Sequence, residues 1–215
     1  MQETQSILKD VLLGVQFTAI LIGLLYFFKL KNSYWKWFSV YLVLIFFQEY
    51  FLFGSESIAY QEKIKYAVFL GIPLQFIFLY WLYAYKSLKN KKMFLLSSLT
   101  YAIIIGFTVY FNTYNEAYSL SNNVGTIILI ILLVLEFIKQ IKNDDILKFR
   151  ENKMFYINIG MVLFYVGNYP YHVFGQELYE NHLKIFNLYN IYFLVTNCIM
   201  YLLFSASFIW GKTQS

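Results

Sequence analysis

Two carboxylates lie inside apolar stretches of this chain, where an ionised group is costly and is therefore a candidate for a functional role. Glu49, with Gln48 beside it, lies in the stretch VLIFFQEYFLFG (43–54), and no basic residue falls within helical reach of it. A carboxylate in such surroundings can bind a cation or an amine, or take up a proton. Glu49 is therefore the first candidate, unless its helix ends early and leaves it among the outer lipid headgroups.

The second carboxylate, Glu136, ends the apolar run TIILIILLVLEF (126–137). Lys139 and Gln140 follow it at the i+3 and i+4 positions of a helix, where side chains are neighbours. Long polar side chains near the end of a membrane helix extend toward the interface. We therefore expect Glu136 to belong to a local pair that snorkels, rather than to a binding site.

Asparagines recur at helical spacing on one face of the apolar segments 154–174 and 185–210. An unpaired amide in hydrocarbon costs several kcal/mol, so both faces are expected to turn away from lipid. One interpretation is hydrogen bonding between helices, worth about 0.6 kcal/mol per contact. The other is a polar ligand pocket in the outer half of the membrane, lined by Gln48, Glu49, Asn168, His172, Asn187 and Asn190.

Gly71 and Pro73 lie in the apolar stretch YAVFLGIPLQFIF (66–78). Proline removes a backbone donor and bends a helix, and a nearby glycine loosens it further. The pair is a candidate hinge, although prolines in membrane helices are often plain kinks.

The composition indicates a membrane protein, because only 13% of the 215 residues are charged and 60% are hydrophobic. The candidate residues must therefore lie on elements that span the membrane. Runs that are apolar on every side exclude a membrane barrel, whose strands alternate. Each apolar segment can cross about 30 Å of hydrocarbon as a helix. We expect an all-α membrane protein with a single seven-helix transmembrane domain over residues 1–215, with helices at about 11–28, 37–53, 66–85, 93–111, 124–141, 154–174 and 185–210.

Most of the 17 lysines and arginines fall on one side if the N-terminus is outside, and acidic residues favour the other side. Cytoplasmic loops carry the basic excess, so we expect the N-terminus outside and the C-terminus in the cytoplasm. The protein is then a multi-pass protein of the cell inner (cytoplasmic) membrane. The link 112–123, which contains Asn122, is expected to lie in an outer loop.

Basic residues on the inner side suggest a docking face as well as contact with anionic lipid. A membrane or cytoplasmic protein is the candidate partner, and the alternative is that these charges serve topology alone. The net charge of +5 is explained by topology and requires no nucleic-acid partner. The candidate partner-binding residues are Lys89, Lys91, Lys92, Lys148 and Arg150.

Catalytic and cofactor motifs are absent from the sequence. It contains no HExxH, GxSxG or phosphate-binding glycine loop. The lone Cys198 allows no intramolecular disulfide and matches no metal-binding spacing. Rhodopsin-type retinal binding needs a Schiff-base lysine, and 185–210 contains none. We expect no enzyme activity, no cofactor and no metal.

The chain is rich in Tyr, Asn and Lys and carries the late stretch MYLLFSASFIW (200–210). In layout and composition, the whole chain resembles small uncharacterised seven-helix membrane proteins of Bacteroidetes-type bacteria. The resemblance implies no activity. The faint likeness of IPLQ to the motif of SWEET-type sugar transporters is not supported, because the prolines do not fall at equivalent places in the two halves of the chain.

Two functions remain open. The first is a receptor-like or regulatory signalling subunit that binds a ligand, a lipid or a partner protein and has no catalytic domain. The second is a small transporter or channel that uses Glu49 as a proton or cation site, with Gly71–Pro73 as its hinge. The small number of ionisable groups in the spans favours the first.

Overall fold

The computed structural model describes residues 2–53, 55, 57–111, 113–143 and 149–212, and about 89% of these are helical. No strand occurs in these ranges, where an isolated parallel bridge joins Asn152 to Lys212. The all-α expectation is therefore confirmed. By length and composition, five helices in these ranges can cross a membrane: Glu3–Phe27, Tyr60–Ser87, Lys91–Phe111, Tyr114–Lys142 and Leu183–Ile209.

The expected spans 37–53 and 154–174 are also helical, but neither is among these five. The second of them continues into the polar stretch GNYPYHVFGQELYEN, which lowers its hydropathy. Length and composition therefore support five spans, and the expected number of seven stays a prediction.

The chain divides into two compact units, and each is described by itself. We call Met1–Leu42 with Phe137–Ser215 the terminal unit, and Val43–Glu136 the central unit. The two boundaries fall within helices α2 and α6.

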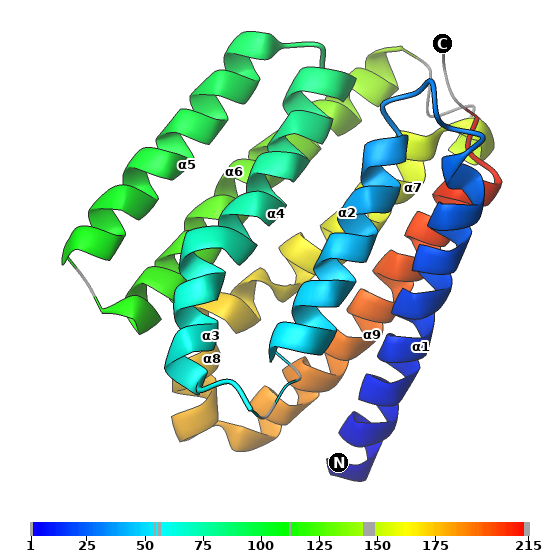
Figure 1. Cartoon of the computed structure of the whole chain (residues 1–215). Coiled ribbons are helices and arrows are strands. Elements are labelled where there is room, and N and C mark those ends of the chain that lie inside the picture. Colours follow the sequence, from blue (N-terminus) through cyan, green and yellow to red (C-terminus); the bar gives the residue numbers. More distant parts are fainter. Residues whose placement is uncertain (1, 54, 56, 112, 144–148, 213–215) are drawn as a thin grey trace. The chain divides into compact units, whose positions relative to one another are not determined.

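The terminal unit is organised around its last helix, α9. Figure 1 shows α1 running alongside α9, and Gln5 donates a hydrogen bond to Asn187 across this pair at 3.4 Å. Helix α7 runs antiparallel to α9, because Lys153 contacts Ser207 near the end of α9. In chain order, the unit contains α1 (Gln2–Phe27), the first part of α2 (Lys36–Phe47), the end of α6 (Tyr114–Lys142), α7 (Lys153–Met161), η5 (Val162–Val166), α8 (Gly167–Asn181) and α9 (Leu183–Ile209).

The central unit contains a long helix interrupted by π-helical turns, followed by two long α-helices (Figure 1). A π-turn widens the backbone ladder by one residue and often marks a functional site. In chain order, the unit contains the end of α2, η1 (Gln48–Phe53), α3 (Tyr60–Tyr66), η2 (Ala67–Gly71), α4 (Ile72–Tyr80), η3 (Trp81–Ser87), α5 (Lys91–Phe111) and most of α6.

Pro73 explains the π-turn η2 just before it. Proline has no N–H to donate, and its ring displaces the carbonyl four residues earlier. The chain adapts by bonding the Ile72 N–H to the Ala67 carbonyl, five residues back. The helix therefore continues through the proline with a local irregularity, as expected at a candidate hinge.

The largest difference from the expected boundaries is at α6, which begins at Tyr114 rather than near 124. The Thr113 N–H and hydroxyl each lie 3.0 Å from Glu116 Oε2, and the Glu116 N–H faces Thr113 Oγ1 at 3.4 Å. This is a capping box, which satisfies backbone donors at a helix start. The polar residues after it are therefore helical, and the expected loop position of Asn122 is wrong.

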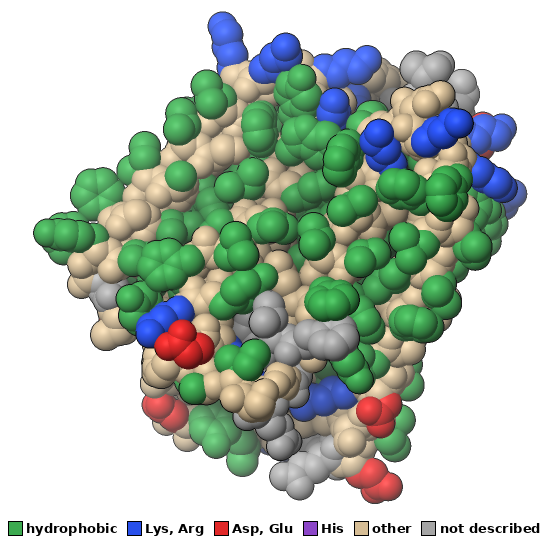
Figure 2. Space-filling view, in the orientation of Figure 1, with side chains coloured by type: hydrophobic (Ala, Val, Ile, Leu, Met, Phe, Trp, Pro, Cys, Tyr) green, Lys and Arg blue, Asp and Glu red, His purple; other side chains and the backbone are tan. Residues whose placement is uncertain are grey.

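Hydrophobic side chains cover the lengths of the helices on the face shown in Figure 2, whereas Lys and Arg gather mainly near helix ends. Along α5, for example, Leu96, Ile103 and Phe107 are 57–68% exposed. A soluble protein seldom leaves so continuous an apolar surface open to water. Lipid contact explains this surface in both units.

Candidate functional site

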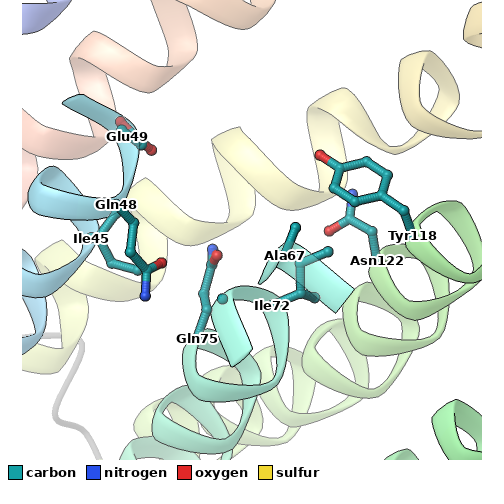
Figure 3. Close-up of a pocket in the computed structure, with 9 residues that line it drawn as sticks. Ile45, Gln48, Glu49, Ala67, Ile72, Gln75, Tyr118 and Asn122 are labelled. Atoms are coloured by element: carbon teal, nitrogen blue, oxygen red, sulfur yellow. The ribbon is translucent and has the colours of Figure 1, made fainter. Parts of the chain in front are cut away.

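A cavity of about 210 Å³ lies within the central unit, and it contains the first candidate, Glu49. Figure 3 shows Gln48 and Glu49 on one wall, Tyr118 and Asn122 on another, and Gln75 between them. The residues that line it are Ile45, Gln48, Glu49, Ala67, Gly71, Ile72, Gln75, Tyr118 and Asn122. We call this cavity the central pocket.

The π-turn η1 presents Gln48 and Glu49 to the central pocket. Helical conformation continues through Phe53, so the helix does not end before Glu49. Whether Glu49 lies among the outer headgroups stays a matter of prediction. Glu49 is nevertheless an exposed side chain, whereas Gln48 is half-buried. The carboxylate therefore lies at the open edge of the pocket, with the carboxamide further in.

Gly71 forms part of the pocket surface because it has no side chain. A Cβ atom there would lie 3.4 Å from the Tyr66 ring and 3.7 Å from Gln48 Oε1. A larger side chain would therefore fill the space between η2 and the Gln48 amide. The candidate hinge residues thus have a second role, since η2 ends at Gly71 and supplies one wall of the pocket.

A tight helix contact lies next to the pocket along α4 and α6. Tyr80 donates a hydrogen bond from its hydroxyl to the Gly125 carbonyl at 3.0 Å. A Cβ atom on Gly125 would come within 2.4 Å of the Phe76 ring, so only glycine fits there. This contact holds Gln75 of α4 at the same level as Asn122 of α6.

Glu136 is not the snorkelling side chain that the sequence suggested. It is 0% exposed, and Ser87 at the end of η3 donates a hydrogen bond from its hydroxyl to Glu136 Oε2 at 2.7 Å. The helix pair brings this partner from 49 residues earlier in the chain, which the local sequence could not reveal. Glu136 thus stabilises contact between η3 and α6.

The other expected pocket residues belong to the terminal unit. Asn168 is 0% exposed and donates from Nδ2 to Thr196 Oγ1 at 2.8 Å, which joins α8 to α9. Asn187 accepts the hydrogen bond from Gln5, and Asn190 is half-buried on the same helix. The side chain of His172 lies outside the described part of the chain. Of the six expected residues, Gln48 and Glu49 line the central pocket. The six-residue pocket stays a prediction.

Three pocket residues were missed by the sequence analysis: Gln75, Tyr118 and Asn122. Gln75 is the only amide in the stretch IPLQFIF, two residues after Pro73. Tyr118 and Asn122 were assigned to a loop. The pattern T-x-x-E at 113–116 would have extended the helix and placed them one turn apart on one face.

The candidate partner-binding residues lie at helix ends. Lys89 has a positive φ of 54° and follows the end of the helix that includes η3. The Asn90 side chain accepts a hydrogen bond from the Met93 N–H at 3.0 Å, which caps the start of α5. Lys91 and Lys92 follow and are exposed. Arg150, also exposed, belongs to the terminal unit. Lys148 lies outside the described residues.

Lys153 is a buried cation that the sequence analysis did not single out. It is 4% exposed, and its Nζ donates a hydrogen bond to the Ser207 carbonyl at 2.9 Å. Burial lowers the pKa of Lys153 from 10.5 to about 8. The Ser207 carbonyl also accepts a hydrogen bond from the Gly211 N–H at 3.2 Å. The ammonium is therefore an additional donor at the C-terminal end of α9, where the helix dipole favours a positive charge. We interpret it as a structural group that ties the start of α7 to the end of α9.

Chemically, the central pocket combines one carboxylate, three carboxamides and a phenol with an aliphatic surface. Such a set can bind and orient a small polar molecule, since a few convergent polar groups in an apolar surround are typical of ligand sites. No nucleophile with an adjacent base occurs among its lining residues. Comparisons with protein-family models, curated proteins and solved structures find no match to this chain.

Proposed function

We propose that this chain is a receptor-like or regulatory subunit of the cell inner membrane that binds a small ligand in the central pocket. It spans the membrane seven times, with the N-terminus outside and the C-terminus in the cytoplasm, and it acts through a partner protein. The observation that carries the proposal is the collection of four strongly polar side chains, Gln48, Glu49, Gln75 and Asn122, around one cavity of a largely apolar chain.

The pocket walls offer a route from ligand to partner. Gly71 and Gln75 belong to the helical run Tyr60–Ser87, which ends next to Lys89 and the start of α5. A ligand that draws η1 and η2 together would shift this helix against α6. The contacts that must adjust are Tyr80 with Gly125 and Ser87 with Glu136. A change in these contacts reaches the basic residues that we propose for partner binding.

A pocket-filling variant tests ligand binding without knowledge of the ligand. Wild type, Gly71→Leu and Gly106→Leu would be purified from native membranes, and their bound small molecules compared by mass spectrometry. Gly71→Leu fills the central pocket, whereas a Cβ atom at Gly106 of α5, outside that pocket, meets nothing within 4 Å. We expect a co-purifying molecule in wild type and Gly106→Leu that is lost from Gly71→Leu. Equal recovery from all three would contradict the proposal.

A transporter is the second candidate, and the irregular helices favour it. The π-turns η1 and η2 and Pro73 lie at the pocket, much as interrupted helices form the sites of secondary transporters. Proteoliposomes separate the two functions. Net uptake of the co-purifying molecule, abolished by Gly71→Leu, would support transport. Binding without uptake would support the receptor.

The partner proposal has its own test. Lys89, Lys91 and Lys92 would be changed together to Gln, and the partner recovered in mild detergent would be compared with wild type. Lys9, exposed near the N-terminus, provides the control as Lys9→Gln. We expect recovery to fall only for the triple variant. Wild-type protein that is recovered alone would contradict the partner proposal.

A further inference from the structure

We propose that the central unit holds an anionic phospholipid at the turn between η3 and α5. The ammonium groups of Lys86 and Lys91, gathered at the Tyr85 ring, bind the lipid phosphate, and we call these three residues the lysine clamp. This goes beyond the proposed function, because it assigns a second site, outside the central pocket, and a lipid as its occupant.

Positive charge is in excess at this turn. Four lysines fall between positions 86 and 92, whereas no Asp or Glu occurs between 81 and 111. Glu136 of α6 is buried beside the end of η3, and its single carboxylate can balance only one ammonium. Three of the four lysines form no ion pair with any residue that the structure describes: Lys89, Lys91 and Lys92.

The Tyr85 ring brings two ammonium groups to one place. Lys86 Nζ lies 4.8 Å from the ring centroid, and Lys91 Nζ, which comes from the next helix, lies 5.8 Å from it. Lys86 Nζ is also 5.3 Å from the centroid of the Trp81 ring. An aromatic face attracts a cation within about 6 Å, so the rings position these groups without neutralising their charge. An anion bound by both ammonium groups would offset their mutual repulsion.

The turn that carries the clamp is held by contacts on both sides. The Asn90 N–H donates to the Ala84 carbonyl at 2.9 Å, while the Asn90 side chain accepts from the Met93 N–H at 3.0 Å. Tyr85 also packs on Phe94 of α5, with ring centroids 6.1 Å apart. The clamp is therefore formed before a ligand arrives, and a preformed site loses less conformational entropy on binding.

An apolar surface continues from the clamp along α5. Leu95 and Leu99 follow Lys91 at intervals of four residues, so the three side chains lie on one face of the helix. Leu95 is 59% exposed and Leu99 is 51% exposed. Figure 2 shows basic side chains at this end of the central unit and hydrophobic side chains along α5. A lipid supplies a phosphate for the clamp and acyl chains for the leucines, whereas a soluble phosphate compound would use only the clamp.

The charge of the headgroup decides which lipid fits. Phosphatidylglycerol carries a negative phosphate and a neutral glycerol, whereas phosphatidylcholine adds a positive trimethylammonium that the clamp would repel. Lysine ammonium groups are common phosphate ligands in proteins, and clusters of them attract anionic lipid. We therefore expect a preference for phosphatidylglycerol over phosphatidylcholine.

Nanodiscs that contain equal amounts of these two lipids, with matched acyl chains, provide the test. The lipids retained by the protein would be counted by native mass spectrometry. We expect wild type to retain phosphatidylglycerol preferentially, and Lys86→Gln with Lys91→Gln to lower this preference about tenfold. The control is Lys29→Gln with Lys36→Gln, one exposed and one half-buried lysine that each lie over a different ring of the terminal unit. The control should keep the wild-type preference.

Replacement of the ring tests the geometry at constant charge. Tyr85→Leu keeps every lysine but removes the surface where two ammonium groups meet, so the preference should fall about fivefold. Tyr85→Phe keeps the ring and should keep the preference. Tyr26→Leu removes a ring with a single lysine, Lys29, over it and is the matched control. An unchanged Tm without added lipid shows that a variant folds, and if Tyr85→Leu does not fold, the two-lysine variant decides against its control.

Four results would overturn the proposal. The first is equal retention of the two lipids by wild type. The second is an equal loss in the Lys29 and Lys36 control, which would indicate general attraction of a basic chain to anionic lipid. The third is an unchanged preference in the two-lysine variant or in folded Tyr85→Leu, and weaker partner recovery by these variants would then assign the turn to a protein. The fourth is displacement of phosphatidylglycerol by excess glycerol phosphate, which would identify a soluble ligand. None of these results bears on the ligand of the central pocket, which the clamp residues do not line.

Discussion

The central and terminal units use the same polar side chains for different purposes. In the terminal unit, amides bond directly between helices, as Asn168 does with Thr196 and Gln5 does with Asn187. In the central unit, Gln75 and Asn122 instead reach one cavity with Gln48. An amide in a membrane helix therefore indicates a polar environment, and local packing determines whether that amide joins two helices or lines a cavity.

Glycine placement explains the difference in packing. In the terminal unit, a Cβ on Gly160 would lie 3.3 Å from the Met200 Cα, so α7 and α9 meet backbone to backbone. In the central unit, Gly125 allows similarly close contact with Phe76, but Gly71 faces side-chain ends and leaves space beside them. Close backbone approach favours direct hydrogen bonds between helices, whereas the gap at Gly71 leaves a cavity.

The contrast between the two units assumes that α6 spans the membrane in the expected orientation. A labelling test of that orientation has the largest expected effect, because each position either reacts from outside or does not. In a Cys198→Ala background, Asn115→Cys should react with an impermeant thiol reagent in whole cells. Asn143→Cys should react only after permeabilisation. Both residues are exposed, and they lie toward opposite ends of α6, in different units. The reverse pattern would overturn the orientation, and equal labelling from outside would contradict a membrane-spanning α6.

The buried Lys153 ammonium of the terminal unit predicts that the free energy of unfolding rises by about 3 kcal/mol with pH. Burial lowers the pKa of Lys153 to about 8 in the folded protein, from its ordinary value of 10.5. Between these values the unfolded chain binds more protons, so stability rises with pH in this window. Below pH 8 both states are protonated, and the full cost of burying the cation is present.

Unfolding free energies in detergent at pH 7.5 to 10.5 would check this effect, with Lys153→Met as the comparison. The variant should lack the rise seen in wild type. Lys184→Met, at an exposed lysine of α9, should keep it. If wild type and Lys153→Met changed in parallel with pH, Lys153 would not be the group responsible. This pH effect arises from a buried group of the terminal unit.

Much of the fold could be predicted from the sequence because hydrocarbon thickness sets helix length. The expected segment 93–111 nearly matches Lys91–Phe111, and 185–210 nearly matches Leu183–Ile209. Hydropathy does not predict helix ends where polar residues remain helical, as at the start of α6. Hydropathy detects the apolar run there, whereas the Thr113–Glu116 capping box determines where the helix begins.

The site was less predictable because its partners are distant in sequence. Glu49 and Gln48 could be selected from their cost in an apolar segment, but Gln75 and Asn122 meet them only through packing. Glu136 shows the same limit, since its local neighbours suggested a snorkelling pair and Ser87 reaches it across helices. Sequence identifies which groups need partners, and the helix contacts determine which partners they obtain.

The close contact between Gly125 and Phe76 predicts that a larger residue at position 125 lowers the free energy of unfolding by about 1–3 kcal/mol. Gly125→Ala would drive a methyl group into the Phe76 ring, and overpacking of this kind is destabilising. Gly106→Ala is the matched control, because nothing lies within 4 Å and alanine favours the helix. Unfolding in detergent should show a loss for the first variant and none for the second. Restoration by adding Phe76→Leu would identify the clash as the cause, whereas a neutral Gly125→Ala would contradict the tight contact.

The smallest expected effect tests the terminal unit's amides directly. If Asn168 and Thr196 stabilise the contact between α8 and α9, a double-mutant cycle with Asn168→Leu and Thr196→Val should give a coupling of about 0.6 kcal/mol. The same variants should still retain the molecule that co-purifies with wild type, because the central pocket is complete without them. A coupling near zero, together with loss of the co-purifying molecule from Asn168→Leu, would favour the six-residue pocket expected from sequence. The division of roles between the two units would then be wrong, since an amide of the terminal unit would contribute to ligand binding.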